Sequence, residues 1–211
     1  MKKIWLCFLV CLCLALPASG CKTAGQPALQ DNKLIVYTSI YPVQFFAQRI
    51  GGDKVQVLNI VPSGAQPHSF EPSTRTVAEL SRSKLFIYNG AGMEHYLAKL
   101  APVLEEAGVK LVDTSTGIEL LSNQEHEHET PEHADSATGH HEHGEFDPHI
   151  WLSPKRAMQQ GQNIYQALAE IDPANTAYYE DNLHKLQQEL EQLDQDFQTT
   201  LGKCASRYLV T

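Results

Sequence analysis

Four apolar runs decide the fold of this 211-residue chain: LIVYTSI at residues 34–40, VQVLNIV at 55–61, LFIY at 85–88 and VKLV at 109–112. Each run is short and almost continuously apolar, which is typical of strands buried on both faces. The segments between the runs, at 41–50, 73–83 and 93–107, are expected to be helical. This alternation predicts an α/β lobe over residues 34–171, with a Rossmann-like, four-stranded parallel sheet covered by helices on both faces.

Two further helices are expected after the sheet. The first spans about 154–170, and the second begins with Asp172 as its cap and Pro173 in its first turn, and continues to Gly202. The second helix carries one apolar stripe with steps of three or four residues: Tyr179, Leu183, Leu186, Leu190, Leu193, Phe197 and Leu201. At about 1.5 Å per residue it would run roughly 45 Å, which exceeds one small lobe. Residues 172–202 are therefore predicted to link two lobes, and residues 203–211 to begin a second lobe that is missing from this chain.

The first twenty residues are typical of an export signal. Lys2 and Lys3 precede an apolar run of thirteen residues, whereas a helix that spans a bilayer needs roughly 20. The small residues at 18–20 lead directly to Cys21, as in the lipobox of bacterial lipoproteins. We expect a lipid on Cys21, with residues 21–33 as the tether to the membrane. The alternative is ordinary cleavage before this cysteine, which would release a soluble exported protein.

The charge and the cysteines restrict the function further. The formal net charge is −9, and removal of the leader with its two lysines changes it to −11, which disfavours nucleic acid and suits cations. Three of the five cysteines lie in the leader, and Cys21 is the lipid site, so only Cys204 stays free. No disulfide framework is available, and the domain depends on a packed core. We expect a monomer that binds no nucleic acid.

Two histidines lie in loops stiffened by prolines. His68 follows the second strand in PSGAQPHSFEP (62–72), and His149 precedes a helix in DPHIWLSP (147–154). Ligands of open α/β sheets bind beyond the carboxyl ends of the strands, and neutral imidazole suits zinc. Either residue alone could be an ordinary loop histidine. Together, in an exported acidic chain, they indicate a candidate metal site.

Other polar and aromatic residues near these loops are less specific. Glu71, in the first histidine loop, could orient a ligand or serve a turn hydrogen bond. Phe70 and Trp151 are expected to pack beside the two loops. His95 and His184 have helical neighbours and no matching partner in the sequence, so we expect them at the surface.

Residues 122–146 interrupt the α/β pattern with a segment that cannot bury a core. It holds seven acidic residues, no Lys or Arg, and six histidines: His126, His128, His133, His140, His141 and His143. We expect a disordered loop. Its imidazoles and carboxylates could share a zinc ion with modest affinity, because ordering the loop costs conformational entropy. The two open interpretations are an auxiliary zinc collector and a dispensable solvated insertion.

Four strings of this sequence resemble the zinc/manganese solute-binding proteins of bacterial ABC transporters (solute-binding protein family 9). They are GAQPHSFEP at 64–72, DPHIWLSP at 147–154, DPAN at 172–175 and YLVT at 208–211. The resemblance implies two α/β lobes joined by one rigid long helix, with a metal in the cleft and His68 and His149 as ligands from the first lobe. It also implies an exported receptor, at the outer face of the cytoplasmic membrane or in the periplasm. Such a receptor captures Zn²⁺ and delivers it to an ABC permease and its ATPase.

The sequence departs from the family pattern at its end. In the family, a third histidine directly follows a strand like YLVT, and an acidic residue or water from the second lobe completes the metal shell. Zinc generally takes four tetrahedral ligands. With two ligands from this lobe, the chain as given is expected to bind zinc weakly.

Three other functions remain alternatives. A zinc hydrolase would need three protein ligands, an open water position and a general base, and the sequence holds no H-E-x-x-H string. A zinc buffer or adhesin-type surface lipoprotein would hold most of its zinc on the loop. A Mn²⁺ receptor is the nearest variant, but manganese prefers oxygen ligands, and the six loop histidines favour zinc.

Overall fold

The four apolar runs form one parallel sheet in the computed structural model, which describes residues 33–122 and 145–205. The sheet order is β2-β1-β3-β4, so β1 lies between β2 and β3 and pairs in parallel with both. The bounds are β1 (Leu34–Thr38), β2 (Val55–Asn59), β3 (Leu85–Tyr88) and β4 (Lys110–Asp113). The predicted α/β fold with a four-stranded parallel sheet is therefore confirmed.

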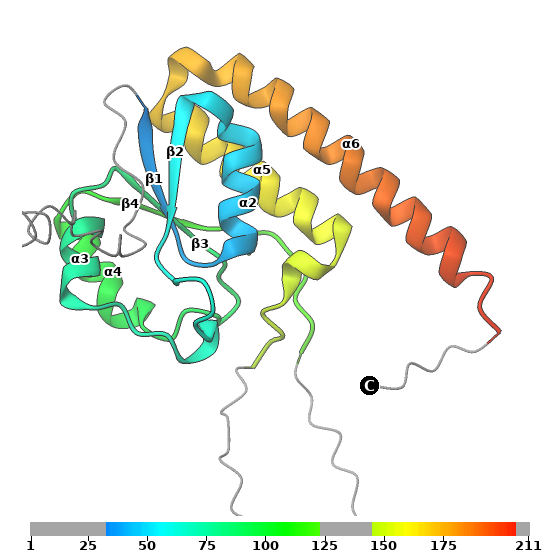
Figure 1. The fold of residues 1–211 in the computed structure, drawn as a ribbon, viewed down its shortest axis with the longest axis horizontal. Coiled ribbons are helices and arrows are strands. Elements are labelled where there is room, and N and C mark those ends of the chain that lie inside the picture. Colours follow the sequence, from blue (N-terminus) through cyan, green and yellow to red (C-terminus); the bar gives the residue numbers. More distant parts are fainter. Residues whose placement is uncertain (1–32, 123–144, 206–211) are drawn as a thin grey trace, which may run out of the picture.

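Helices cover both faces of the sheet (Figure 1). The chain steps from β1 outward to β2 and then returns past β1 to β3, so right-handed crossovers place the connecting helices on opposite faces. One face carries α2 (Tyr41–Gly51), α5 (Pro154–Ile171) and α6 (Thr176–Leu201), and the other carries α3 (Thr74–Leu80) and α4 (Leu97–Glu106). Short 3₁₀ turns lie at η1 (Gly52–Lys54), η2 (Pro67–Ser69), η3 (Ile150–Leu152) and η4 (Pro173–Asn175).

The core lies between the sheet and these helices. Leu85, Phe86 and Ile87 are consecutive in β3 and fully buried, because this central strand has helices on both faces. From the helices, Ile50 of α2 and Ile164 of α5 are also fully buried in the same hydrophobic cluster. Packing on both faces thus holds the short strands in place. The loops that follow the strands lie at the carboxyl edge of the sheet.

Helix α4 begins later than predicted. The sequence indicated a helix from residue 93, whereas α4 begins at Leu97. Gly90, Ala91 and Gly92 all have positive φ angles, of 79°, 52° and 84°. The Glu94 carboxylate accepts hydrogen bonds from the backbone N–H groups of Asn89 and Gly90, at 2.9 and 3.0 Å. The chain is therefore held as a loop where apolar periodicity alone favours a helix.

The long helix is confirmed, although its start differs from the prediction. The backbone first makes the 3₁₀ turn η4, and α6 then covers 26 residues, or about 39 Å. Asp172 does not cap a backbone N–H with its side chain. Its carboxylate instead accepts hydrogen bonds from the Tyr179 hydroxyl at 2.6 Å and the Asn175 amide at 2.7 Å.

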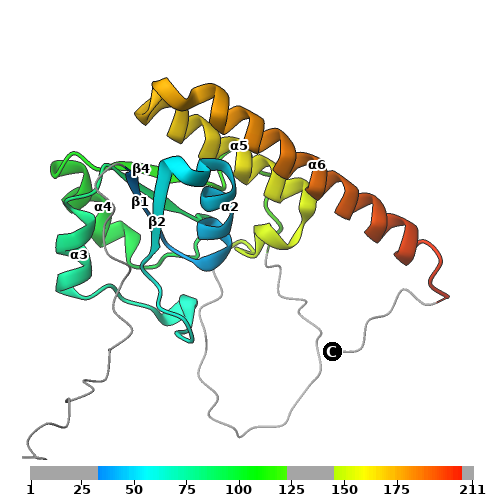
Figure 2. The same cartoon turned by 45° about the horizontal axis from the view of Figure 1, so that its top comes forward.

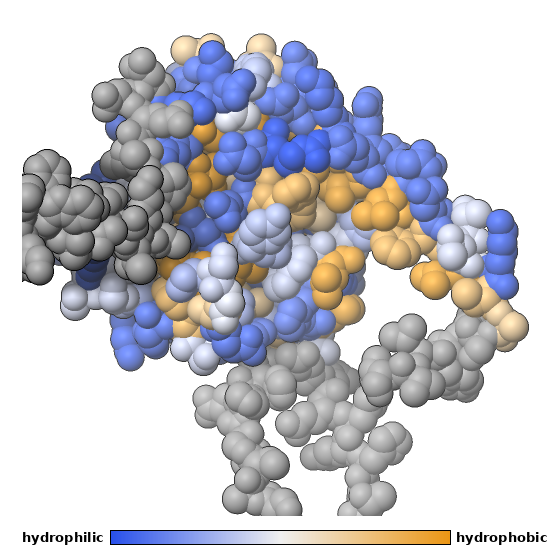
Figure 3. All heavy atoms as spheres, viewed as in Figure 1, coloured by the Kyte–Doolittle hydropathy of each residue, from blue (hydrophilic) through white to orange (hydrophobic). Residues whose placement is uncertain are grey.

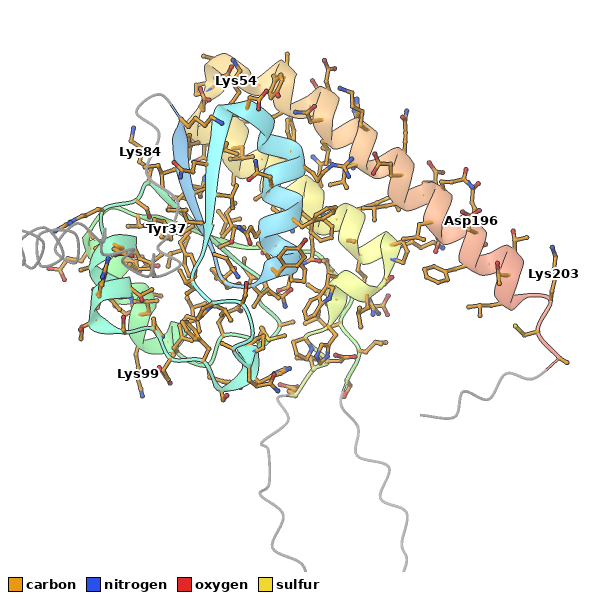
Figure 4. The ribbon with its side chains drawn as sticks, in the orientation of Figure 1. Tyr37, Lys54, Lys84, Lys99, Asp196 and Lys203 are labelled. Atoms are coloured by element: carbon orange, nitrogen blue, oxygen red, sulfur yellow. The ribbon has the colours of Figure 1, made fainter. Side chains whose placement is uncertain are left out.

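The apolar stripe of α6 is buried in its first half and exposed in its second. Tyr179, Leu183 and Leu186 pack into the lobe, whereas Leu193, Phe197 and Leu201 are 43%, 48% and 62% exposed. Figures 1 and 2 show this second half projecting past the sheet, and Figure 3 shows hydrophobic atoms along its underside. Figure 4 labels Asp196 and Lys203 on the same projecting end. Within residues 33–122 and 145–205, no helix is both long and apolar enough to cross a membrane.

Candidate metal site

The two proline-braced loops meet at the carboxyl edge of the sheet. His68 is the middle residue of η2, which follows β2 and has a proline in its first turn. His149 immediately precedes η3 and then α5. Its φ of −80° and ψ of 43°, with a 2.8 Å hydrogen bond from Ile150 N–H to the Pro148 carbonyl, describe an inverse γ-turn centred on His149. Each imidazole is therefore carried by a short, constrained turn.

The imidazoles of His68 and His149 face each other. Their Nε2 atoms are 3.3 Å apart, their ring centroids are 5.3 Å apart, and both residues are exposed. Two nitrogens bound to one tetrahedral zinc at about 2.0–2.1 Å would lie about 3.3–3.4 Å from each other. The observed Nε2–Nε2 distance matches this spacing, so the two residues fit a shared zinc ion.

Asp147 orients the His149 ring. One oxygen of its carboxylate, Oδ1, lies 2.7 Å from His149 Nδ1 and accepts the His149 backbone N–H at 2.9 Å. A proton on Nδ1 leaves the lone pair of Nε2 toward His68, which is the usual arrangement of carboxylate, histidine and zinc. The hydrogen bond from the His149 backbone is the main cause that lowers the pKa of Asp147, and it outweighs the opposing effect of partial burial. Asp147 is thus held as an anion beside the ring.

The part of the chain that the structure describes brings two candidate ligands together and adds no third. In residues 33–122 and 145–205, no group of three or more His, Cys, Asp or Glu side chains could hold a metal ion. The six loop histidines, at positions 126, 128, 133, 140, 141 and 143, lie outside the described residues, as do Cys21, the leader and the terminal YLVT.

The other residues noted in the sequence have simpler positions. His95 and His184 are exposed, as expected for surface residues. Phe70 and Trp151 are half-buried against the hydrophobic core beside the two histidine loops, which confirms them as packing residues. Cys204 is free and exposed.

Sequence reasoning considered Glu71 as the supporting carboxylate and missed the role of Asp147. Glu71 is exposed on the loop after η2. The signal for Asp147 was its place two residues before His149, close enough for one carboxylate to reach both the ring and the backbone N–H of the histidine. A second missed residue is Asn89 at the end of β3, whose side chain donates a 2.9 Å hydrogen bond to the Pro148 carbonyl.

Comparison with known proteins identifies relatives of this chain. The family model described as "Zinc-uptake complex component A periplasmic" (ZnuA) matches residues 36–211. The "High-affinity zinc uptake system protein ZnuA" of Bacillus subtilis is 33% identical over 206 residues, which is 97% of this chain and 63% of the relative. The "Zinc-binding lipoprotein AdcA" of Streptococcus pneumoniae is 33% identical over 211 residues, 100% of this chain and 40% of the relative.

A solved structure of one of these relatives has a similar fold. The Zn(II)-bound ZnuA-like domain of Streptococcus pneumoniae AdcA superposes with a TM-score of 0.69 at 29% identity, over 82% of this chain and 57% of that one. The chain thus spans between 40% and 63% of the length of the two curated relatives. Because the family model covers residues 36–211, well over half of the chain, the chain belongs to the ZnuA family of zinc-uptake components.

Proposed function

We propose that this chain supplies the first metal-binding lobe of an extracytoplasmic receptor, which captures Zn²⁺ and delivers it to an ABC permease and its ATPase. The observation that carries the proposal is the pair of Nε2 atoms 3.3 Å apart, with the His149 ring oriented by Asp147. Both imidazoles are exposed at the open edge of the sheet, where an ion can enter and leave.

The ligand count suits capture followed by release. His68 and His149 provide two of the four ligands that zinc generally takes, so a zinc ion on this lobe keeps positions for further ligands. An ion held by two neutral imidazoles carries its full positive charge, and the anionic Asp147 beside His149 favours it. Binding to this lobe alone is therefore weak, and groups from outside the described residues would raise the affinity.

Zinc titration of histidine variants tests the proposal. His68→Ala and His149→Ala should each weaken zinc binding to this site by more than about tenfold, the low end of the loss that follows removal of a supporting residue. His95→Ala and His184→Ala are matched controls, because both remove an exposed histidine elsewhere on the lobe. Calorimetry in which all four variants bind zinc like the unaltered chain would exclude His68 and His149 as ligands.

Metal choice and turnover separate this proposal from its alternatives. A zinc receptor should release no product from ester, peptide or phosphate substrates, whereas a zinc hydrolase should turn one of them over. Competition with Mn²⁺ should favour zinc, because the two ligands are imidazole nitrogens. For a zinc buffer or adhesin, loss of the permease would leave the zinc-starvation phenotype unchanged; for a receptor, loss of either protein gives the same defect.

The proposed location follows from the leader and from relatives named as lipoproteins. We propose that a lipid on Cys21 anchors the mature chain to the outer face of the membrane, with residues 21–33 as its tether. Labelling with a radioactive fatty acid should mark the unaltered chain and leave Cys21→Ala unmarked. An unlabelled chain recovered free in the periplasmic fraction would instead indicate ordinary cleavage.

A further inference from the structure

We propose that Asn89 is a positioning residue, which sets the direction of the His149 imidazole through the carbonyl of Pro148. This inference rests on the proposed function, in which His149 binds zinc. The Asn89 amide acts on the backbone turn that carries this imidazole, one residue before the ligand itself.

The contact falls on the atom that closes the turn. The Pro148 carbonyl accepts the Ile150 N–H at 2.8 Å, which forms the γ-turn around His149, and it also accepts Asn89 Nδ2 at 2.9 Å. The direction of the His149 side chain depends on the φ and ψ of that turn. A donor that holds the Pro148 carbonyl in place therefore also sets the direction in which the His149 side chain leaves the backbone.

Asn89 itself is held rigidly. Its side chain is fully buried, its Nδ2 also donates to the Gly90 carbonyl at 3.0 Å, and its Oδ1 accepts Gln160 Nε2 from α5 at 3.2 Å. The same Gln160 nitrogen donates to the Thr114 hydroxyl at 2.9 Å. Because water does not replace these bonds in the interior, the amide keeps one orientation.

The backbone of Asn89 is held as firmly as its side chain. Its N–H lies 2.9 Å from the Glu94 carboxylate and 3.2 Å from the Ser39 hydroxyl, and its carbonyl accepts the Thr114 hydroxyl at 3.0 Å. These partners come from the ends of β1 and β4 and from the loop after β3. The Asn89 side-chain amide therefore connects the carboxyl edge of the sheet to the turn at residues 148–150.

Asn89 and Asp147 act on different parts of the loop that carries His149. The Asp147 carboxylate sets the rotation and tautomer of the ring, and its backbone N–H is tied to the Leu121 carbonyl at 2.8 Å. Asn89 holds the next carbonyl along the chain. Without Asn89 the turn loses its buried donor, while the contacts of Asp147 persist.

The test compares Asn89→Ala with Asn163→Ala in the full chain. Asn163 is the matched control, because its Nδ2 also donates two 2.9 Å hydrogen bonds to backbone carbonyls, those of Thr114 and Thr116, and neither belongs to the turn at residues 148–150. Gln160→Met is a milder second variant, which keeps the bulk of the side chain but removes the donor to Asn89. Urea midpoints measure the loss of stability in each, and zinc chloride is the probe.

The readouts are zinc affinity and the ¹⁵N resonances of the imidazole rings, assigned with His68→Gln and His149→Gln. Asn89→Ala should weaken zinc binding about tenfold beyond Asn163→Ala, with a smaller zinc-induced shift at His149 Nε2 and a retained shift at His68. Gln160→Met should move both quantities in the same direction by less. Equal zinc affinity and equal shifts in Asn89→Ala and Asn163→Ala would overturn the positioning role. If zinc shifts neither ring in the unaltered chain, the proposed function fails instead.

Discussion

The Asp147 carboxylate binds both the ring and the backbone N–H of the same histidine. Two bonds from one residue fix the ring rotation and the local backbone together, which a bond to the ring alone would not do. The desolvation cost of the Asp147 carboxylate is small, because the side chain is partly exposed and its charge keeps some hydration. Preorganisation of His149 is thus built into three consecutive residues, Asp147, Pro148 and His149.

The pKa of Asp147 predicts a pH dependence. Its folded pKa is lowered, chiefly by the hydrogen bond from the His149 backbone, so the unfolded chain binds the proton more tightly. Its contribution to stability should be complete above the unfolded value of about 3.9 and disappear as the pH falls through the lower folded value. Acid unfolding followed by circular dichroism should show a smaller slope below pH about 4 for Asp147→Asn; identical slopes would contradict the assignment.

The backbone conformation of Gly90 predicts that the stability of the fold is sensitive to a substitution there. Its φ is +79°, and a Cβ there would lie 1.9 Å from Asp113 Oδ1. Gly90→Ala should therefore lose about 1–2 kcal/mol for the left-handed backbone and more for displacing Asp113. Gly108→Ala is the control, since Gly108 has a φ of +78° and a Cβ added there would meet nothing within 4 Å. Equal urea midpoints for the two variants would show that the crowding at Gly90 has no energetic effect.

At the scale of elements, the apolar stripe of α6 is buried in the first half of the helix and exposed in the second. Leu186 is 2% exposed and Leu193 is 43% exposed, although both belong to the same periodic pattern. The first half of the helix packs on α2 and α5. Two ion pairs extend the contact, Arg49–Glu189 at 2.6 Å to α2 and Lys155–Asp194 at 3.6 Å to α5. Beyond this point the helix projects from the lobe (Figure 2).

This difference predicts unequal costs for one substitution. Leu186→Ala should lose about 2–5 kcal/mol of unfolding free energy, because it leaves a cavity in a packed core. Leu193→Ala should change the same quantity by about 0.5 kcal/mol or less in this chain, because the side chain is half exposed. Denaturant unfolding of both variants gives the comparison. A large loss for Leu193→Ala would mean that the projecting half is packed in solution.

At the scale of the whole molecule, the two flanks of the histidine-rich segment meet next to Asp147, two residues before His149. Its flanks are joined by an antiparallel bridge between Ser122 and Phe146, and the Asp147 N–H donates to the Leu121 carbonyl at 2.8 Å. The segment therefore leaves and rejoins the fold at one point, directly before His149. An insertion with adjacent ends places little demand on the rest of the fold.

Deletion of residues 123–144 is predicted to preserve the fold and the site. The urea midpoint should stay the same or rise slightly, because a shorter loop costs less entropy to close. Calorimetry should show less zinc bound per chain, with the ion at His68 and His149 retained and still sensitive to His149→Ala. A deletion that abolishes this remaining binding would make the loop part of the site.

Local sequence signals located most elements but missed details that depend on contacts. The apolar runs predicted the strands because burial on both faces requires them. The predicted start of α4 was wrong, since the positive φ angles at residues 90–92 and the hydrogen bonds of Glu94 override the apolar periodicity. Asp172 does occupy the predicted N-cap position before Pro173, but its side chain caps no backbone N–H. Its carboxylate instead accepts a hydrogen bond from Tyr179, seven residues away.

The sequence by itself determined the parallel sheet, the long helix and the two proline-braced histidines, because these depend on local periodicity and on residues that constrain their own backbone. Only the tertiary structure decided that Nε2 of His68 and Nε2 of His149, 81 residues apart, lie 3.3 Å from each other. It also decided that the Asp147 carboxylate contacts the His149 ring and that Asn89 donates a hydrogen bond to the Pro148 carbonyl. Such distances arise when the sheet order brings separate loops to one edge, and no local pattern encodes that order.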